Sequence, residues 1–138
     1  MSVEKQQLEA RRWLRQADDD LEASRALEVA GKYAQAAFFA QQAGEKALKA
    51  VWLALDADPW GHSLGRLVWE MPDTAREVFA PLLEEALALD KLYIPTRYPD
   101  ALANLTPAEA YTRREAQTAQ AQAGAIVSAV KRWLDAAT

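Results

Sequence analysis

The sequence predicts an all-α protein, an antiparallel up-and-down bundle of three long helices and one or two short ones. Alanine, leucine and glutamine are abundant while the 138 residues include only 5 glycines, which favours helix. Apolar residues recur every three or four positions over long stretches, and no stretch alternates apolar and polar residues as a half-buried strand would. The length indicates one domain, 1–138.

The first two long helices are expected from about Glu4 to Val29 and from Tyr33 to about Leu55, separated by the helix-ending Gly31. The buried face of the first is marked by apolar residues at helical spacing: Ala10, Trp13, Ala17, Leu21 and Leu27. The second carries a seam of small side chains that lets a neighbouring backbone approach closely: Ala36, Ala40, Ala43, Ala47, Ala50 and Ala54. It is therefore predicted to be a central helix.

Shorter helices are expected in the middle of the chain. Ser63 is a favourable N-cap for a helix that ends near Glu70, and Asp73 is expected to cap the next one. Pro81 interrupts the following stretch, 74–92, because proline lacks a backbone donor and clashes with the preceding turn. This stretch is expected to form either two helices that meet just before the proline or one kinked helix.

The last long helix is expected from Thr106 to about Asp135. Pro95 and Pro99 are expected to hold the segment before it extended. Thr106 is followed by a proline at the first helical position and by Glu109, which together are typical of a helix start. The residues expected to face inward are Ala116, Ala119, Ala123, Ile126, Val130 and either Trp133 or Leu134.

Composition excludes several kinds of site. The chain has no cysteine, which excludes disulfides, thiolate nucleophiles and Cys-ligated metals, and its single histidine excludes a histidine pair within one subunit. We therefore expect no metal and no cofactor. The net charge of -4 argues against a whole-surface nucleic-acid binder but leaves room for a local basic groove. No signal peptide or membrane span is apparent, so a cytoplasmic protein is expected.

Arg97 is the strongest candidate for a ligand-binding residue. Two prolines stiffen its loop, and Tyr93 and Tyr98 flank it. A guanidinium binds phosphate bidentately and an aromatic ring stacks on a nucleobase, so this arrangement suits a nucleotide. The alternative is a structural role, in which Arg97 pairs with Asp100 or caps a helix C-terminus.

The other candidates lie in the second helix and the loop after it. Helical spacing places Glu45, Lys46 and Lys49 in one polar patch with Gln42, where they could line a groove. Alternatively, Glu45 and Lys49 form an ordinary surface pair worth about 0.3 kcal/mol. Histidine suits proton transfer near neutral pH, so His62 is the candidate general base, although a loop imidazole is more often a solvated bystander.

Three strings, Gln41–Ala50, His62–Ser63 and Leu92–Asp100, resemble the HEPN domain family. The opening helix around Trp13 and the alanine-rich tail after Tyr111 resemble it as well, so the resemblance covers nearly the whole chain. It implies a helical bundle, nucleotide binding and frequent occurrence beside a nucleotidyltransferase.

Many members of that family are ribonucleases, whose signature is an arginine followed after four to six residues by a histidine. This chain lacks the motif, because no histidine follows Arg97, Arg113 or Arg114. Metal-independent RNA cleavage needs an imidazole close to the scissile phosphate. His62 could replace it only if the fold or a partner subunit brings it beside Arg97. No catalytic residue is therefore assigned.

The resemblance implies a non-catalytic nucleotide-binding and assembly module that forms a homodimer and partners a minimal nucleotidyltransferase, as in a toxin–antitoxin pair. One alternative is a ribonuclease-like toxin or its degenerate relative, acting on RNA. Another is a purely structural dimer without a ligand. The candidate nucleotide-binding residues are Arg97, Tyr93, Thr96, Tyr98, Asp100, Lys46, Lys49 and His62.

Overall fold

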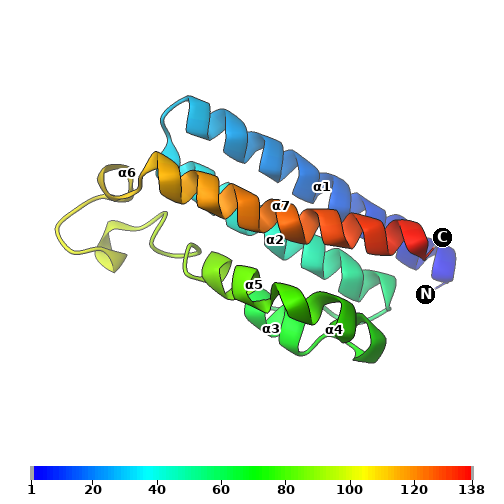
Figure 1. The fold of residues 1–138 in the computed structure, drawn as a ribbon. Coiled ribbons are helices and arrows are strands. Elements are labelled where there is room, and N and C mark those ends of the chain that lie inside the picture. The colour runs from blue at the N-terminus through cyan, green and yellow to red at the C-terminus, as the bar shows by residue number, and fades with distance from the viewer. Residues whose placement is uncertain (1, 138) are drawn as a thin grey trace.

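Three long helices form the body of the bundle in the computed structural model, which describes residues 2–137 (Figure 1). They are α1 (Val3–Val29), α2 (Tyr33–Ala54) and α7 (Arg113–Ala136). Helix α2 is central, since it packs against α1, α7 and the layer of short helices. No strand occurs among the described residues. The predicted all-α bundle of three long helices is confirmed.

The short helices lie along one side of α2 and α7 (Figure 1). They are α3 (Leu64–Trp69), α4 (Asp73–Phe79) and α5 (Leu83–Asp90), with the 3₁₀ turn η1 (Ala80–Leu82) between α4 and α5. Pro81 lies in that turn, so of the two expected arrangements the pair of helices is correct. Within residues 2–137 this layer contains three short helices and a 3₁₀ turn, more than the one or two short helices expected.

Two expected helix starts are wrong. Pro72 occupies the N-cap position of α4, and Asp73 is its first helical residue. Thr106 starts only the one-turn helix α6 (Pro107–Ala110), where hydrogen bonds from Thr106 lower the pKa of Glu109. The backbone of Tyr111 is extended, which ends α6, and a second capping box formed by Thr112 and its N3 glutamate then starts α7.

The expected extended segment between Pro95 and Pro99 is instead a turn. The backbone N–H groups of Arg97 and Tyr98 both donate to the carbonyl of Ile94, at 3.0 and 3.2 Å. Proline fixes only φ near −65°, a value shared by turns and extended chain, so the prolines alone did not decide between them. The turn brings the Arg97 side chain back over the preceding residues.

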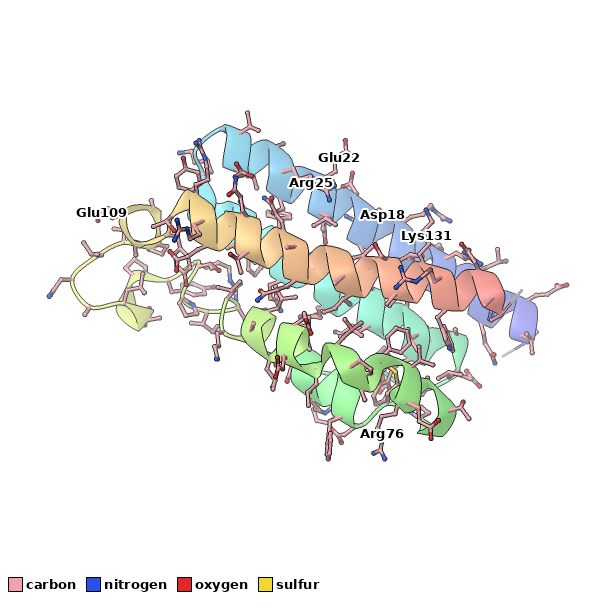
Figure 2. All side chains as sticks on the ribbon, viewed as in Figure 1. Asp18, Glu22, Arg25, Arg76, Glu109 and Lys131 are labelled. Carbon is pink, nitrogen blue, oxygen red and sulfur yellow. The ribbon has the colours of Figure 1, made fainter. Side chains whose placement is uncertain are left out.

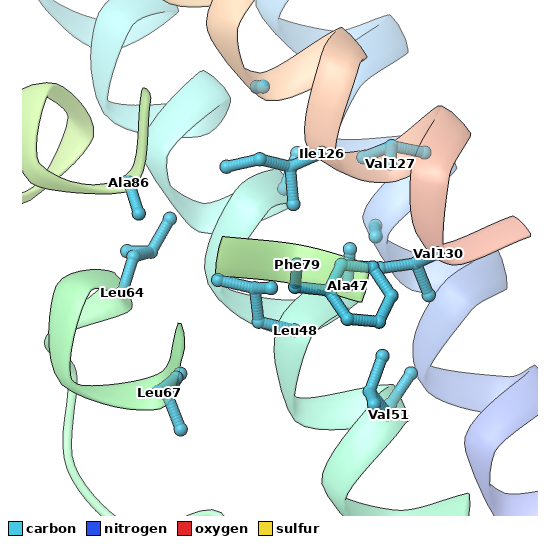
Figure 3. Packing of buried hydrophobic residues seen from close by; sticks show 14 of the residues in the cluster. Ala47, Leu48, Val51, Leu64, Leu67, Phe79, Ala86, Ile126, Val127 and Val130 are labelled. Carbon is cyan, nitrogen blue, oxygen red and sulfur yellow. The ribbon is translucent and has the colours of Figure 1, made fainter. Parts of the chain in front are cut away.

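The core is built on the predicted alanine seam of α2, which is buried throughout. Leu48, Phe79 and Ile126 fill the space between α2, α4 and α7 (Figure 3). Gly44 lets the short helices approach α2 closely, since a Cβ there would lie 2.8 Å from Cδ2 of Leu64. The central helix thus has small residues where its neighbours pack.

The start of α1 and the end of α7 meet at one end of the bundle (Figure 1). Arg11 joins them through an ion pair with Asp135 at 2.7 Å and a hydrogen bond to the Leu134 carbonyl at 3.1 Å. The connection 91–112 lies at the opposite end. Among the described residues, no helix is long and apolar enough to cross a membrane.

Candidate functional site

Asp90, at the end of α5, holds the loop that carries His62 against α5 by hydrogen bonds. Its carboxylate accepts hydrogen bonds from the Ser63 hydroxyl at 2.9 Å and from the backbone N–H groups of Leu64 and Gly65 at 2.6 and 3.0 Å. It therefore satisfies free donors at the start of α3. Because Tyr93 follows Asp90 by three residues, the same carboxylate holds His62 close to Tyr93.

Arg97, Tyr93, Tyr98, His62 and Phe38 form one group of side chains, here named the Arg97 cluster. The guanidinium carbon of Arg97 lies 4.5 Å from the ring centroids of both Phe38 and Tyr93 and 5.1 Å from that of Tyr98. The Arg97 Nε donates to the Tyr93 carbonyl at 2.8 Å. His62 stacks on Tyr93 at 4.9 Å with an interplanar angle of 18°. The cluster combines a fixed cation with several aromatic rings.

Glu45 of α2 lies behind the cluster and is only 4% exposed. Its carboxylate is 3.2 Å from each of three groups, the Gln41 amide nitrogen, Lys49 Nζ and His62 Nδ1. The His62 side chain is 59% exposed. A carboxylate on Nδ1 fixes the orientation of an imidazole, so the Nε2 of His62 is left for a ligand or for solvent.

Comparison with known families decides the identity of the bundle. The model of the HEPN domain matches residues 10–133. This chain belongs to the HEPN domain family. Comparison with curated proteins gives no match.

Three solved structures resemble the chain over most of its length. TT1696 from Thermus thermophilus is 44% identical with a TM-score of 0.85, over 89% of this chain and 96% of that one. ST0689, an archaeal HEPN homologue, is 35% identical with a TM-score of 0.76, over 91% and 97%. The HEPN domain protein tm0613 from Thermotoga maritima is 33% identical with a TM-score of 0.69, over 90% and 98%.

The HEPN fold brings some of the predicted site residues together. The Arg97 guanidinium lies over the rings of Tyr93 and Tyr98, and His62 stacks on the Tyr93 ring. Lys49 joins them indirectly, because Glu45 contacts both Lys49 and His62. The cluster therefore links a cationic loop, a histidine and the polar stripe of α2.

Three predicted residues lie elsewhere. Lys46 leans toward α1 and pairs with Asp20, whose carboxylate is buried. Thr96 is buried, and its hydroxyl donates to the Leu92 carbonyl, which is a structural role. Asp100 is exposed and makes no ion pair with Arg97 in the part of the chain that the structure describes.

Phe38 and Asp90 contribute to the site but are not among the residues that the sequence suggests, and Glu45 is suggested only as part of the polar patch on α2. The sequence does hold an indication for Glu45. It lies beside the alanine seam, and a carboxylate that is buried together with the seam needs charged or hydrogen-bonding partners. Asp90 had no local signal, because its partners begin 27 residues earlier in the chain.

Proposed function

We propose that this HEPN protein is a non-catalytic nucleotide-binding and assembly module that works as a homodimer with a minimal nucleotidyltransferase. One observation supports the binding of a nucleotide. Arg97 is held by a backbone carbonyl and aromatic rings, and it makes no ion pair within residues 2–137. Its terminal nitrogens are therefore available to a phosphate, and the rings to a base. The dimer and the partner are proposed from the family likeness.

Calorimetric titration with ATP, ADP and AMP at low salt tests the ligand. Hydrogen bonds to a charged group contribute about 1.5–3 kcal/mol, so Arg97→Ala is expected to weaken binding about 10-fold to 100-fold. Arg76→Ala is the matched control. Arg76 also lies over an aromatic ring, 5.7 Å from that of Trp69, but on α4, away from the connection 91–112 (Figure 2). Equal affinity of Arg97→Ala and wild type would contradict the proposal.

The assembly part is tested separately. Sedimentation of the purified chain is expected to show a dimer, and mixing it with a nucleotidyltransferase encoded beside it is expected to give a larger complex. If the chain dimerises but no nucleotide binds at low salt, the purely structural dimer is the better description.

A ribonuclease-like activity is the second candidate. One observation favours it: His62, the only histidine, stacks on the Tyr93 ring that Arg97 also contacts. An imidazole oriented by Glu45 could then take part in proton transfer near a phosphate bound to Arg97. Incubation with RNA tests it, since this activity would be lost in both His62→Ala and Arg97→Ala. Cleavage with that dependence would replace the non-catalytic proposal.

A further inference from the structure

The contacts of His62 leave one of its two ring nitrogens available. Its Nδ1 lies 3.2 Å from the Glu45 carboxylate, and its ring stacks on Tyr93. The side chain is 59% exposed, and Nε2 has no hydrogen-bond partner within residues 2–137. Because a carboxylate accepts hydrogen bonds, the neutral imidazole carries its proton on Nδ1. The neutral ring therefore presents an unshared electron pair at Nε2.

Protonation reverses what Nε2 offers to an anion. A neutral Nε2 is an acceptor, and a phosphate oxygen is an acceptor as well, so no hydrogen bond forms between them. A protonated Nε2 is a charged donor, which phosphate oxygens bind strongly. Histidine changes its charge between about pH 5 and 8. His62 is thus a residue that disfavours an anion above this range and favours an anion below it.

The positive charge of a protonated His62 is not cancelled by its neighbours. The Glu45 carboxylate already pairs with Lys49 Nζ at 3.2 Å, so these two charges offset each other. Asp90 is engaged by Ser63 and by two backbone N–H groups at the start of α3. Of the residue types around the imidazole, only histidine ordinarily changes charge between about pH 5.5 and 8. The charged and titratable residues on the elements packed against its loop are Glu45 and Lys49 of α2, Arg66 of α3 with its partner Glu70, Asp90 of α5, and Tyr93 and Arg97 of the turn that follows.

The Tyr93 ring brings this charge close to Arg97. The Tyr93 centroid lies 4.9 Å from the imidazole centroid and 4.5 Å from the guanidinium carbon. The two groups are therefore no farther apart than these two distances combined, which is within the Debye length of about 10 Å at 0.1 M salt. Arg97 makes no ion pair within residues 2–137. Two like charges so close repel each other, and an anion beside both relieves the repulsion.

We infer that His62 makes binding at the Arg97 cluster depend on pH, because the phosphate of the ligand binds together with a proton that Nε2 takes up from water. This inference rests on the proposed function, since Arg97 supplies the permanent charge of the same site. Coupling of this kind is reciprocal: the proton raises the affinity for the phosphate, and the phosphate favours the protonated imidazole. The site therefore binds its ligand more tightly in mildly acidic than in alkaline solution.

Calorimetric titration with ATP at about pH 5.5 and about pH 8, at constant low salt, tests the inference in wild type and in His62→Gln. The terminal phosphate of ATP also changes charge in this range, so the quantity compared at each pH is the ratio of the two affinities. A hydrogen bond to a charged group contributes a factor of about ten or more. Wild type is therefore expected to bind about tenfold more tightly than His62→Gln at the lower pH. At the higher pH the two should bind alike.

His62→Lys is the matched control, because a lysine at this position carries its charge at both pH values. Its affinity relative to His62→Gln is expected to be the same at the lower and the higher pH. A pH dependence of this ratio as large as that of wild type would assign the effect to another group and overturn the inference.

A measurement on wild type alone remains decisive if the variants do not fold. His62 is the only histidine, so the chain gives one pair of imidazole ¹⁵N signals. These two signals lie far apart in a neutral ring and close together in a protonated one. Saturation with ATP at about pH 7 is expected to bring them closer together. If they do not move although ATP binds, the inference is overturned.

The outcomes separate the inference from the proposed function. If Arg97→Ala weakens ATP binding while wild type and His62→Gln keep the same ratio of affinities at both pH values, the pH dependence is overturned and the proposed function stands. If ATP binds at neither pH, or binds Arg97→Ala as tightly as wild type at both, the inference and the proposed nucleotide site are overturned together.

Discussion

Replacing Glu45 by alanine is expected to lower the free energy of unfolding by about 3–5 kcal/mol, because it removes the acceptor of a buried ionic network. The Lys49 side chain is only 10% exposed and would be left without its carboxylate. The Gln41 amide, in a fully buried residue, would lose its acceptor, and His62 would lose the contact that orients it. Urea unfolding of the variant and wild type measures the difference.

A double variant separates the network from simple loss of packing. Glu45→Met/Lys49→Met replaces the ion pair by apolar chains of similar length, so it should recover most of the lost stability. It should nevertheless fail to orient His62, which would weaken nucleotide binding if His62 contributes to it. A single Glu45→Ala variant within about 1 kcal/mol of wild type would show that water replaces the carboxylate without strain, contrary to the expectation from its burial.

The second large effect is expected for Asp90→Ala. Leaving a buried donor unsatisfied costs about 1–3 kcal/mol, and two backbone N–H groups and one hydroxyl lose their acceptor. Because Asp90 is only partly buried, water compensates in part, and we expect a loss of about 3 kcal/mol. Thermal unfolding measures the loss, and faster amide exchange at Leu64 and Gly65 would locate it.

Asp100→Ala is the control for Asp90→Ala. Asp100 is exposed in the turn η2 (Pro99–Ala101), and its substitution is expected to change stability by less than about 0.5 kcal/mol. If both variants lose the same free energy of unfolding, removal of a negative charge explains the loss. The role of Asp90 as a hydrogen-bond acceptor at the start of α3 is then refuted. If only Asp90→Ala is affected, it should also bind nucleotide more weakly, because His62 would no longer be held against Tyr93.

The helices that the sequence predicts best are those with strong local signals. The alanine seam predicted α2 as the central helix, and the Ser63 cap predicted the start of α3; both are confirmed. The start of α7 differs from the expected Thr106 because two capping boxes follow each other, and the first begins only the one-turn helix α6. Local capping signals mark where a helix begins but not how far it continues.

The candidate site could be predicted only in part. Arg97, Tyr93 and Tyr98 are close in sequence, so their grouping in the structure follows from a local turn. The contacts of Glu45 with His62 and of Asp90 with Ser63 join residues 17 and 27 positions apart. Such contacts depend on how the helices pack, which no short string of residues encodes. Lys46 and Lys49 illustrate the same limit, since Lys46 pairs with Asp20 of α1 whereas Lys49 pairs with Glu45 of its own helix.

The Arg11–Asp135 ion pair has a practical consequence for redesign of the chain. Because it holds the first and last helices side by side, a short glycine-serine linker could join them. New N- and C-termini could then be placed between residues 102 and 105, in the connection at the far end of the bundle. Such a circular permutant would keep every helix intact. It would also allow a reporter to be fused next to the Arg97 cluster, where ligand binding could be followed directly.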